Sequence, residues 1–215
     1  MSGADERIED LLALAPVLPL LTVDDAASAV AAARALVRGG LRAIEVTLRT
    51  PAALDAIAAI RRDVPDAIPG AGTVLTPAHL ADAQRAGAAF VVSPGFTPRL
   101  ADAIRAAGAA WLPGVATASE LMFGIEAGFA SFKLFPAASA GTALLRAWLG
   151  PFPHVRFCPT GGIDAANAAE WLALRNVACV GGSWIAPPAA IKAGDWDAVE
   201  SRARAAAALK RASLR

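Results

Sequence analysis

Short runs of apolar residues alternate along the chain with longer, alanine-rich stretches of helical spacing. This alternation is typical of βα units, in which helices join parallel strands. The pattern also predicts a helix before the first strand, within residues 1–16, and a C-terminal helix within residues 195–215. The predicted strands are residues 17–21, 43–48, 68–71, 90–93, 110–112, 131–134, 155–158 and 178–180.

Capping residues mark the ends of the predicted helices. Side-chain oxygens that can accept from the first free N–H groups stand before five helical stretches, at Asp24, Thr76, Thr97, Thr117 and Asp164. Glycines at positions 39–40, 87, 108 and 128 follow helical stretches, where a left-handed residue is favoured. Because no linker or low-complexity segment interrupts this order, we expect one domain over residues 1–215.

Eight βα units within one chain of 215 residues predict a single (β/α)8 (TIM) barrel with an extra N-terminal helix. In such barrels the active site lies at the carboxyl ends of the strands, and phosphate often binds after the seventh and eighth strands. A doubly wound open sheet is the alternative. The segment 70–72, Gly-Ala-Gly, gives it little support because the third glycine of a dinucleotide-binding turn is missing.

Composition and charge exclude several classes of protein. Twenty basic and nineteen acidic residues leave no positive field for nucleic acid. The apolar run at 11–23 is short and contains two prolines, and the first residues lack the order of a secretory signal. We therefore expect a cytoplasmic protein, bound to no membrane, whose partners are small molecules or further copies of itself.

Cysteine and histidine give no sign of redox or metal chemistry. Cys158 and Cys179 lie in apolar, strand-like segments without CxxC spacing, which favours reduced core thiols. His79 falls in a predicted helix and His154 precedes a strand, so neither stands where a catalytic metal would be bound. We expect no metal site.

Lys133 is the residue with the clearest chemical meaning, since it lies in a strand of otherwise apolar residues, 130–136. A buried ammonium is costly to desolvate, so such a lysine tends to lose its proton and can attack a ketone to form a Schiff base. The other two lysines, Lys192 and Lys210, lie near the C-terminus. Arginine, which supplies the other seventeen basic residues, stays protonated and cannot do this chemistry.

Glu45 is the acidic partner that the pattern offers, because it alone among the acidic residues lies within a predicted strand. Strand alternation puts Glu45, Thr47 and Arg49 on one face, and in the sixth strand it puts Lys133 on the same face as Phe135. If both faces point inward, acid and amine meet in one dry space suited to proton transfer. A purely structural Lys–Glu ion pair is the alternative.

Two kinds of anion-binding group stand at strand exits. Arg49 offers a fork matched to a carboxylate, and Thr73 adds a hydroxyl and a backbone donor, so together they could hold a 2-oxo acid. A solvated loop arginine and a capping threonine are the alternatives. The Gly161-Gly162 and Gly181-Gly182-Ser183 segments let backbone N–H groups approach a phosphate. These two glycine segments therefore predict a phosphorylated substrate.

With these residues, the chain resembles the 2-dehydro-3-deoxy-phosphogluconate (KDPG) aldolase family. Its members are the class I aldolases of the Entner–Doudoroff pathway, and some also act on 4-hydroxy-2-oxoglutarate. The segments that carry the resemblance are EVTLRT at 45–50, GAGTVL at 70–75, SPG at 93–95, PG at 113–114, FKLFPA at 132–137, FCPTGGI at 157–163 and GGSW at 181–184.

The resemblance implies a role for each matching residue. Lys133 would form the Schiff base, Glu45 would act as general acid and base, and Arg49 with Thr73 would hold the pyruvyl carboxylate. Thr160 would contact the hydroxylated part of the substrate. Phosphate would bind at Gly161, Gly162, Gly182 and Ser183, and Pro94 and Phe135 would line the site. The family resemblance further implies a homotrimer of single barrels and no metal or organic cofactor.

The expected reaction is reversible cleavage of 2-dehydro-3-deoxy-6-phospho-D-gluconate to pyruvate and D-glyceraldehyde 3-phosphate. Thr160 and the 45–49 motif favour this gluconate-derived substrate over the galactonate type. Phe96 and Leu134 depart mildly from the family pattern, which bears on substrate range. The alternatives are a 4-hydroxy-2-oxoglutarate or other pyruvate aldolase, and, from another class, a phosphosugar-binding barrel without chemistry or an isomerase.

Overall fold

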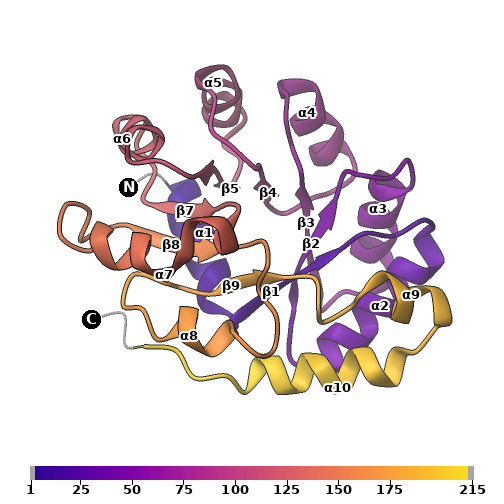
Figure 1. Cartoon of the computed structure of the whole chain (residues 1–215). Helices are drawn as coiled ribbons and strands as arrows, with labels where there is room; N and C mark the ends of the chain where they lie inside the picture. The colour runs from indigo at the N-terminus through magenta and orange to yellow at the C-terminus, as the bar shows by residue number, and fades with distance from the viewer. Residues whose placement is uncertain (1–2, 213–215) are drawn as a thin grey trace.

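The protein is an α/β fold in which helices surround a curled, parallel sheet (Figure 1). The structure is a computed structural model that describes residues 3–212. The strands are β1 (Val17–Leu21), β2 (Ala43–Thr47), β3 (Ile68–Gly72), β4 (Val91–Val92), β5 (Trp111–Leu112), β6 (Gly114–Val115), β7 (Ser131–Leu134), β8 (Arg156–Pro159) and β9 (Val180–Gly182).

The strands pair in parallel within two sheets. Six strands follow the order β5-β4-β3-β2-β1-β9, and three follow the order β6-β7-β8. Only Pro113 separates β5 from β6, and isolated bridges join Phe157 to Val177 and Thr160 to Gly181. The predicted parallel α/β architecture is confirmed. The strands form two sheets connected by these bridges rather than one continuous set of ladders.

Some of the predicted strand boundaries match the structure and others are shifted. The first and sixth predicted strands, 17–21 and 131–134, match β1 and β7. The predicted eighth strand, 178–180, lies instead at Val180–Gly182, and a further short strand follows Pro113. Pairing with parallel partners draws both of these glycine-containing segments into the sheet, despite the low strand propensity of glycine.

The helices lie outside the sheet, apart from the first. They are α1 (Gly3–Ala13), α2 (Ala26–Arg38), α3 (Ala53–Asp63), α4 (Pro77–Arg85), α5 (Pro98–Ala107), α6 (Ala118–Glu126), α7 (Ala137–Trp148), α8 (Ala168–Leu172), α9 (Pro188–Ala193) and α10 (Trp196–Ala207). A helix does precede the first strand, and a C-terminal helix ends at Ala207, earlier than the predicted 195–215. Residues 1–2 and 213–215 of the two predicted segments lie outside the described residues.

Local hydrogen bonds explain where the helices begin. The threonine caps predicted for α4, α5 and α6 are confirmed, since each hydroxyl accepts from a backbone N–H three residues on. Two aspartate caps are wrong. Asp25, not Asp24, caps α2 through Ser28 N at 2.7 Å. Asp164 accepts from Ala166 and Asn167 within a turn, four residues before α8 begins.

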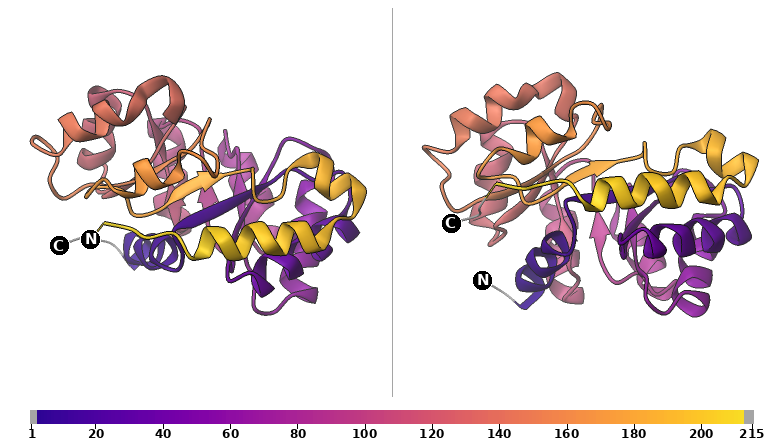
Figure 2. Two further views of the ribbon diagram at one scale, coloured as in Figure 1. Left: turned by 60° about the horizontal axis from the view of Figure 1, so that its bottom comes forward. Right: turned by 90° about the horizontal axis from the view of Figure 1, so that it is seen from below.

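Apolar side chains form two separate clusters, one on each face of the sheet. The larger lies between the strands and the outer helices, and α10 packs alongside α2 there (Figure 2). The smaller lies on the inner face and includes Leu18, Phe90 and Leu112. Ile8 and Leu12 of α1 belong to this inner cluster, so α1 covers the inner face of the sheet. Among the helices of residues 3–212, none is long and apolar enough to span a bilayer.

Candidate active site

Lys133 of β7 and Glu45 of β2 meet on the inner face of the sheet. Lys133 Nζ lies 3.3 Å from Glu45 Oε1, and the two residues are only 5% and 1% exposed. Ile44 and Val46, which alternate with Glu45, belong to the outer cluster, and Ala43 belongs to the inner one. The predicted inward direction of this strand face is therefore confirmed.

The second carboxylate oxygen of Glu45 has no hydrogen-bond partner. Glu45 Oε2 is buried, and no donor reaches it within the part of the chain that the structure describes. An unsatisfied buried acceptor is costly, commonly by about 1–3 kcal/mol or more for a charged group. A hydroxyl group of a ligand could satisfy it, which makes Glu45 available for proton exchange with a bound molecule.

Gly72, at the end of β3, makes room for this carboxylate. Gly72 is in register with Thr47 on the neighbouring strand. A Cβ atom at Gly72 would lie 2.2 Å from Glu45 Oε1 and 2.6 Å from Glu45 Cγ, a separation that atoms do not tolerate. The glycine in the 70–72 segment therefore serves the position of Glu45, a function that the sequence pattern did not indicate.

Arg49 and Thr73, predicted to hold a carboxylate, lie just beyond the ends of β2 and β3. The Arg49 side chain is exposed, and its guanidinium has no acceptor among residues 3–212. Thr73 has a φ of 61°, a left-handed conformation that costs a residue with a Cβ about 1–3 kcal/mol. Such strain recurs at binding sites, so both residues remain suited to a ligand.

Hydrogen bonds of three threonines fix the exits of β1 and β2, and of these the sequence pattern placed only Thr47 on the face of Glu45. Thr47 Oγ1 donates to the Leu21 carbonyl at 3.1 Å and lies 2.9 Å from Thr22 Oγ1. Thr50 Oγ1 donates to Val23 O at 2.6 Å. These bonds hold the backbone on both sides of Arg49. Thr22 stands at a strand exit, so the rule that found Arg49 applies to it as well.

The turn that contains Pro94 is held by Ser93 and Trp111. Ser93 Oγ donates to Gly95 O at 2.7 Å and accepts from Trp111 Nε1 at 3.0 Å. A Cβ at Gly114 would lie 2.3 Å from the Pro94 carbonyl, so the two strand exits are in close contact. Trp111 is buried, as expected of a core tryptophan, but its N–H also positions this turn. No sequence signal indicated that second role.

The Gly161-Gly162 segment presents free backbone N–H groups. Gly161 and Gly162 have φ values of 99° and 75°, which glycine adopts without strain. Among the described residues, no backbone carbonyl or side chain accepts from the N–H groups of Gly161, Gly162 or Ser183. Consecutive free N–H groups of this kind form anion-binding concavities. This geometry suits the predicted phosphate site.

Thr160 connects the two glycine segments. It forms a bridge with Gly181, where a Cβ would lie 2.2 Å from Thr160 Oγ1. The Thr160 hydroxyl is buried and donates to the Cys158 carbonyl at 3.3 Å. Gly182 follows at the end of β9, so the structure brings all the predicted phosphate-binding positions to one side of the sheet.

Phe135 lies between the glycine segments and the lysine. Its ring centroid is 5.4 Å from Lys133 Nζ. A Cβ at Gly161 would approach the same ring to 3.2 Å. The Phe135 ring therefore lies between the Lys133 amine and the free N–H groups, which are about one ring width apart. The predicted site residues form one contiguous region at the strand exits.

The two cysteines lie inside the sheet, close to this region. Both are free and buried, with Cys158 Sγ and Cys179 Sγ 3.5 Å apart. The hydrogen bond to Cys158 and burial together raise the pKa of the Cys179 thiol well above its usual value.

His79 Nδ1 accepts from the Leu75 N–H at 3.4 Å in the loop after β3. Within residues 3–212, no three histidine, cysteine or acidic side chains gather closely enough to bind a metal.

Comparison with known sequences gives a consistent result. The family model described as "Aldolase: KDPG and KHG aldolase" matches residues 8–202. A 2-dehydro-3-deoxy-phosphogluconate aldolase of Pseudoalteromonas atlantica is 51% identical over 201 residues, which cover 93% of this chain and 94% of the relative. A KHG/KDPG aldolase of Escherichia coli K12 is 50% identical over 199 residues, which cover 92% and 93%.

Solved structures agree with the sequence matches. The 2-keto-3-deoxy-6-phosphogluconate aldolase of Zymomonas mobilis, solved with 3-phosphoglycerate, superposes with a TM-score of 0.92 at 45% identity, covering 98% of this chain and 100% of that chain. A KDPG aldolase of Legionella pneumophila superposes with a TM-score of 0.91 at 44% identity, covering 94% and 98%. That structure holds pyruvate captured at low pH as a covalent carbinolamine intermediate.

Proposed function

Because this chain belongs to the KDPG and KHG aldolase family, we propose that it reversibly cleaves 2-dehydro-3-deoxy-6-phospho-D-gluconate to pyruvate and D-glyceraldehyde 3-phosphate. One observation supports this reaction above the others. A buried lysine amine lies 3.3 Å from a buried carboxylate that keeps one oxygen unsatisfied. An amine nucleophile and a proton acceptor are the two groups that a Schiff-base aldolase requires.

Lys133 begins the reaction by adding its neutral amine to the C2 ketone. The carbinolamine loses water and gives an iminium ion, which withdraws electrons from the neighbouring carbon atoms. The C3–C4 bond then breaks, its electron pair moves into the enamine, and the aldehyde leaves. Protonation of the enamine at C3 and hydrolysis of the imine release pyruvate and restore the amine. A carbinolamine of pyruvate in the Legionella pneumophila relative supports the first of these steps.

Glu45 transfers the protons in this scheme. It assists loss of water from the carbinolamine and accepts the proton of the C4 hydroxyl as the C3–C4 bond breaks, with a water molecule relaying it. The free Oε2 atom is the acceptor that these steps use. Glu45→Gln should slow proton transfer while still permitting some imine to form, and an unchanged pH–rate profile would contradict the assignment.

The remaining predicted residues hold the two ends of the substrate. Arg49 and Thr73 bind the pyruvyl carboxylate, and their exposed or strained positions without protein partners support this role. Gly161, Gly162, Gly182 and Ser183 bind phosphate. Thr160 contacts the hydroxylated chain between the two ends, and Pro94 and Phe135 line the site.

The phosphate site predicts a preference for phosphorylated substrates, and measuring that preference tests the proposal. A coupled assay of pyruvate release should give a much higher kcat/KM for the phosphorylated sugar acid than for 4-hydroxy-2-oxoglutarate, because only the former uses the free N–H groups. Equal values would favour the alternative, a broad 2-oxo acid aldolase, which the name of the Escherichia coli relative supports. Turnover of neither substrate would favour a binding barrel or an isomerase.

The curled sheet is, in this proposal, a complete (β/α)8 barrel of one domain over residues 1–215. If β5 and β6 count as one strand across Pro113, the pairings run from β1 to β5 and from β6 to β8. The bridges Phe157–Val177 and Thr160–Gly181 then join the segments that contain β8 and β9. Pairing of β9 with β1 supports closure. Slow amide hydrogen exchange in all eight strands would agree with a closed barrel. Rapid exchange along the whole boundary between two neighbouring strands would contradict it.

The proposal includes a homotrimer that works in the cytoplasm. Large apolar side chains are exposed on α6, at Met122, Phe123 and Ile125, and before α4 at Leu75. Such residues in a group mark a protein contact more often than solvent. Light scattering should give three times the chain mass of 21.8 kDa, and Phe123→Glu should reduce it. A wild-type protein of single-chain mass would contradict the trimer.

A further inference from the structure

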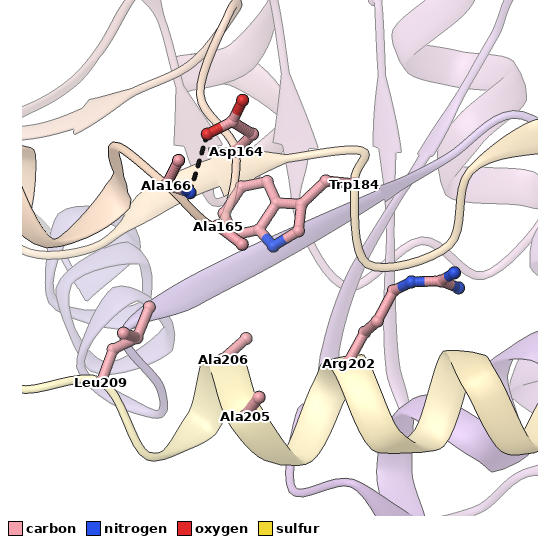
Figure 3. A pocket seen from close by; sticks show the side chains of 8 residues that line it. All are labelled: Asp164, Ala165, Ala166, Trp184, Arg202, Ala205, Ala206 and Leu209. Atoms are coloured by element: carbon pink, nitrogen blue, oxygen red, sulfur yellow. Dashed lines mark hydrogen bonds between the residues drawn. The ribbon is translucent and has the colours of Figure 1, made fainter.

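A cavity of about 520 Å³ lies outside the candidate active site, between α10 and the loops that follow β8 and β9 (Figure 3). Sites for small molecules commonly have volumes of about 300–1,000 Å³. Its walls are mainly apolar, from Ala206 of α10, from Leu209 just after that helix and from the ring of Trp184. Two charged side chains, Asp164 and Arg202, complete the lining.

The charged groups lie on different sides of the indole ring. In Figure 3 Asp164 lies above the indole ring of Trp184, and the Arg202 guanidinium lies farther to the right and points away from the ring. Asp164 Oδ1 accepts from the backbone N–H groups of Ala166 and Asn167, so this carboxylate already has donors. Arg202 has no acceptor among the described residues. The lining of the cavity therefore includes one unpaired cation, at Arg202, and one large aromatic ring, at Trp184.

We propose that this cavity is a second ligand site, which binds a small aromatic molecule that carries one carboxylate. Its ring would stack on Trp184 and pack on the alanine surface of α10, and its carboxylate would pair with Arg202. A ring without charge would leave Arg202 unpaired, and a small anion without a ring would leave the apolar wall solvated. The combination of both groups defines the ligand class.

The walls of the cavity continue the segments that bind phosphate in the proposed function, so this part of the inference rests on that proposal. Trp184 packs directly on Gly182, where a Cβ would lie 1.6 Å from the ring atom Cζ3. Asn167 Nδ2 donates to the Gly162 carbonyl at 3.0 Å and ties the Asp164 turn to the first glycine pair. A ligand that shifts Trp184 must therefore disturb the backbone at Gly182, and it should raise KM for the phosphorylated substrate.

Nuclear magnetic resonance of the five tryptophan indole N–H groups tests binding directly, without any activity assay. Trp184→Phe identifies the Trp184 signal, and phenylacetate serves as the probe. The Trp184 signal should shift progressively with phenylacetate and far less with 2-phenylethanol or acetate. Arg202→Gln should weaken phenylacetate binding by about two- to five-fold, as for an exposed ion pair. Arg204→Gln is the matched control, because Arg204 pairs with Glu200 and does not line the cavity.

Each result supports or overturns the site. No shift at Trp184 with phenylacetate would overturn the proposal, and equal shifts with 2-phenylethanol would overturn the charge requirement. An equal loss with Arg204→Gln would show general attraction to the helix rather than a site. If phenylacetate binds and KM for the phosphorylated substrate stays unchanged, the site stands and its link to phosphate binding is wrong. If the protein cleaves no substrate at all, the binding result still stands on its own.

Discussion

The inner face of the sheet has two ends with opposite character. At one end, Ile8 and Leu12 of α1 pack on Leu18 and Phe90 in a cluster without charge. At the other end, where the strands leave the sheet, Lys133 and Glu45 are buried as an ion pair with an unsatisfied oxygen. The apolar end can only stabilise the fold. The polar end has a desolvation cost that its contribution to stability does not explain.

This contrast separates stability from chemistry within one sheet. Replacing a buried ion pair with apolar residues is often neutral or stabilising, so the pair is a poor candidate for a structural device. Apolar packing, in contrast, contributes about 25 cal/mol for each Å² removed from water. The difference predicts that changes at the apolar end should alter stability and leave turnover intact, and that changes at the polar end should remove turnover even where stability is restored.

Lys133→Ala should have the largest effect and abolish turnover, because neither of the other two lysines, Lys192 and Lys210, lies at a strand exit. Its removal also leaves the Glu45 carboxylate buried without a partner, which costs about 3–5 kcal/mol of unfolding free energy. Adding Glu45→Gln to the same chain should recover part of that stability and none of the activity. Urea unfolding measures the stability, and the pyruvate assay measures the activity. Wild-type activity in either variant would contradict the assignment of the chemistry to the polar end.

Gly72→Ala should come next, since the new methyl group would lie 2.2 Å from Glu45 Oε1 and force that carboxylate to move. Gly72 does not have a positive φ, so the clash alone is responsible. A displaced catalytic group can cost roughly 10²-fold in rate, and we expect a loss of kcat/KM of that order. Gly150→Ala is the matched control, because a Cβ there meets nothing within 4 Å. An unaltered kcat/KM in Gly72→Ala would show that Glu45 need not occupy its observed position.

Ile8→Ala tests the apolar end. Ile8 is fully buried, so the truncation should lower the free energy of unfolding by about 2–5 kcal/mol, with kcat close to that of the wild type. Leu14→Ala is the comparison within the same segment, because Leu14 is 47% exposed and its loss should change stability by no more than about 0.5 kcal/mol. Equal effects of the two substitutions would mean that α1 does not pack on the inner face.

The cysteines between the two ends should show the smallest effect. The raised pKa of the Cys179 thiol keeps it protonated above neutral pH, and burial keeps reagents away. Iodoacetamide at pH 8 should therefore leave the folded protein unmodified over a period in which the urea-unfolded chain reacts completely. Mass spectrometry counts the adducts. Rapid modification of the folded protein would show that the inner face opens to solvent between the two ends.

Much of the polar end could be predicted because strand alternation is a local rule. Parity along two strands predicted which residues share a face with Glu45 and with Lys133, and the structure, in which both faces point inward, brings the two side chains to 3.3 Å. The sequence also predicted that Gly161 and Gly162 present backbone N–H groups to an anion, because two glycine-containing segments follow consecutive strands, and both glycines have a positive φ.

Other parts of the site depend on contacts between distant segments, which no local pattern contains. The support of Pro94 by Trp111 and the space that Gly72 leaves for Glu45 arise only when neighbouring strands align. The short strand after Pro113 and the shifted β9 were missed for the same reason, because pairing with a neighbour outweighed the poor strand propensity of glycine and proline.

Borohydride trapping is the most direct test of the central claim that Lys133 is a nucleophile. The wild-type protein is incubated with pyruvate and sodium borohydride, digested, and analysed by peptide mass spectrometry. We predict a reduced, pyruvate-derived adduct on the peptide that contains Lys133 and none on those that contain Lys192 or Lys210. Absence of the adduct at Lys133 under conditions in which a known Schiff-base aldolase is fully trapped would contradict the account.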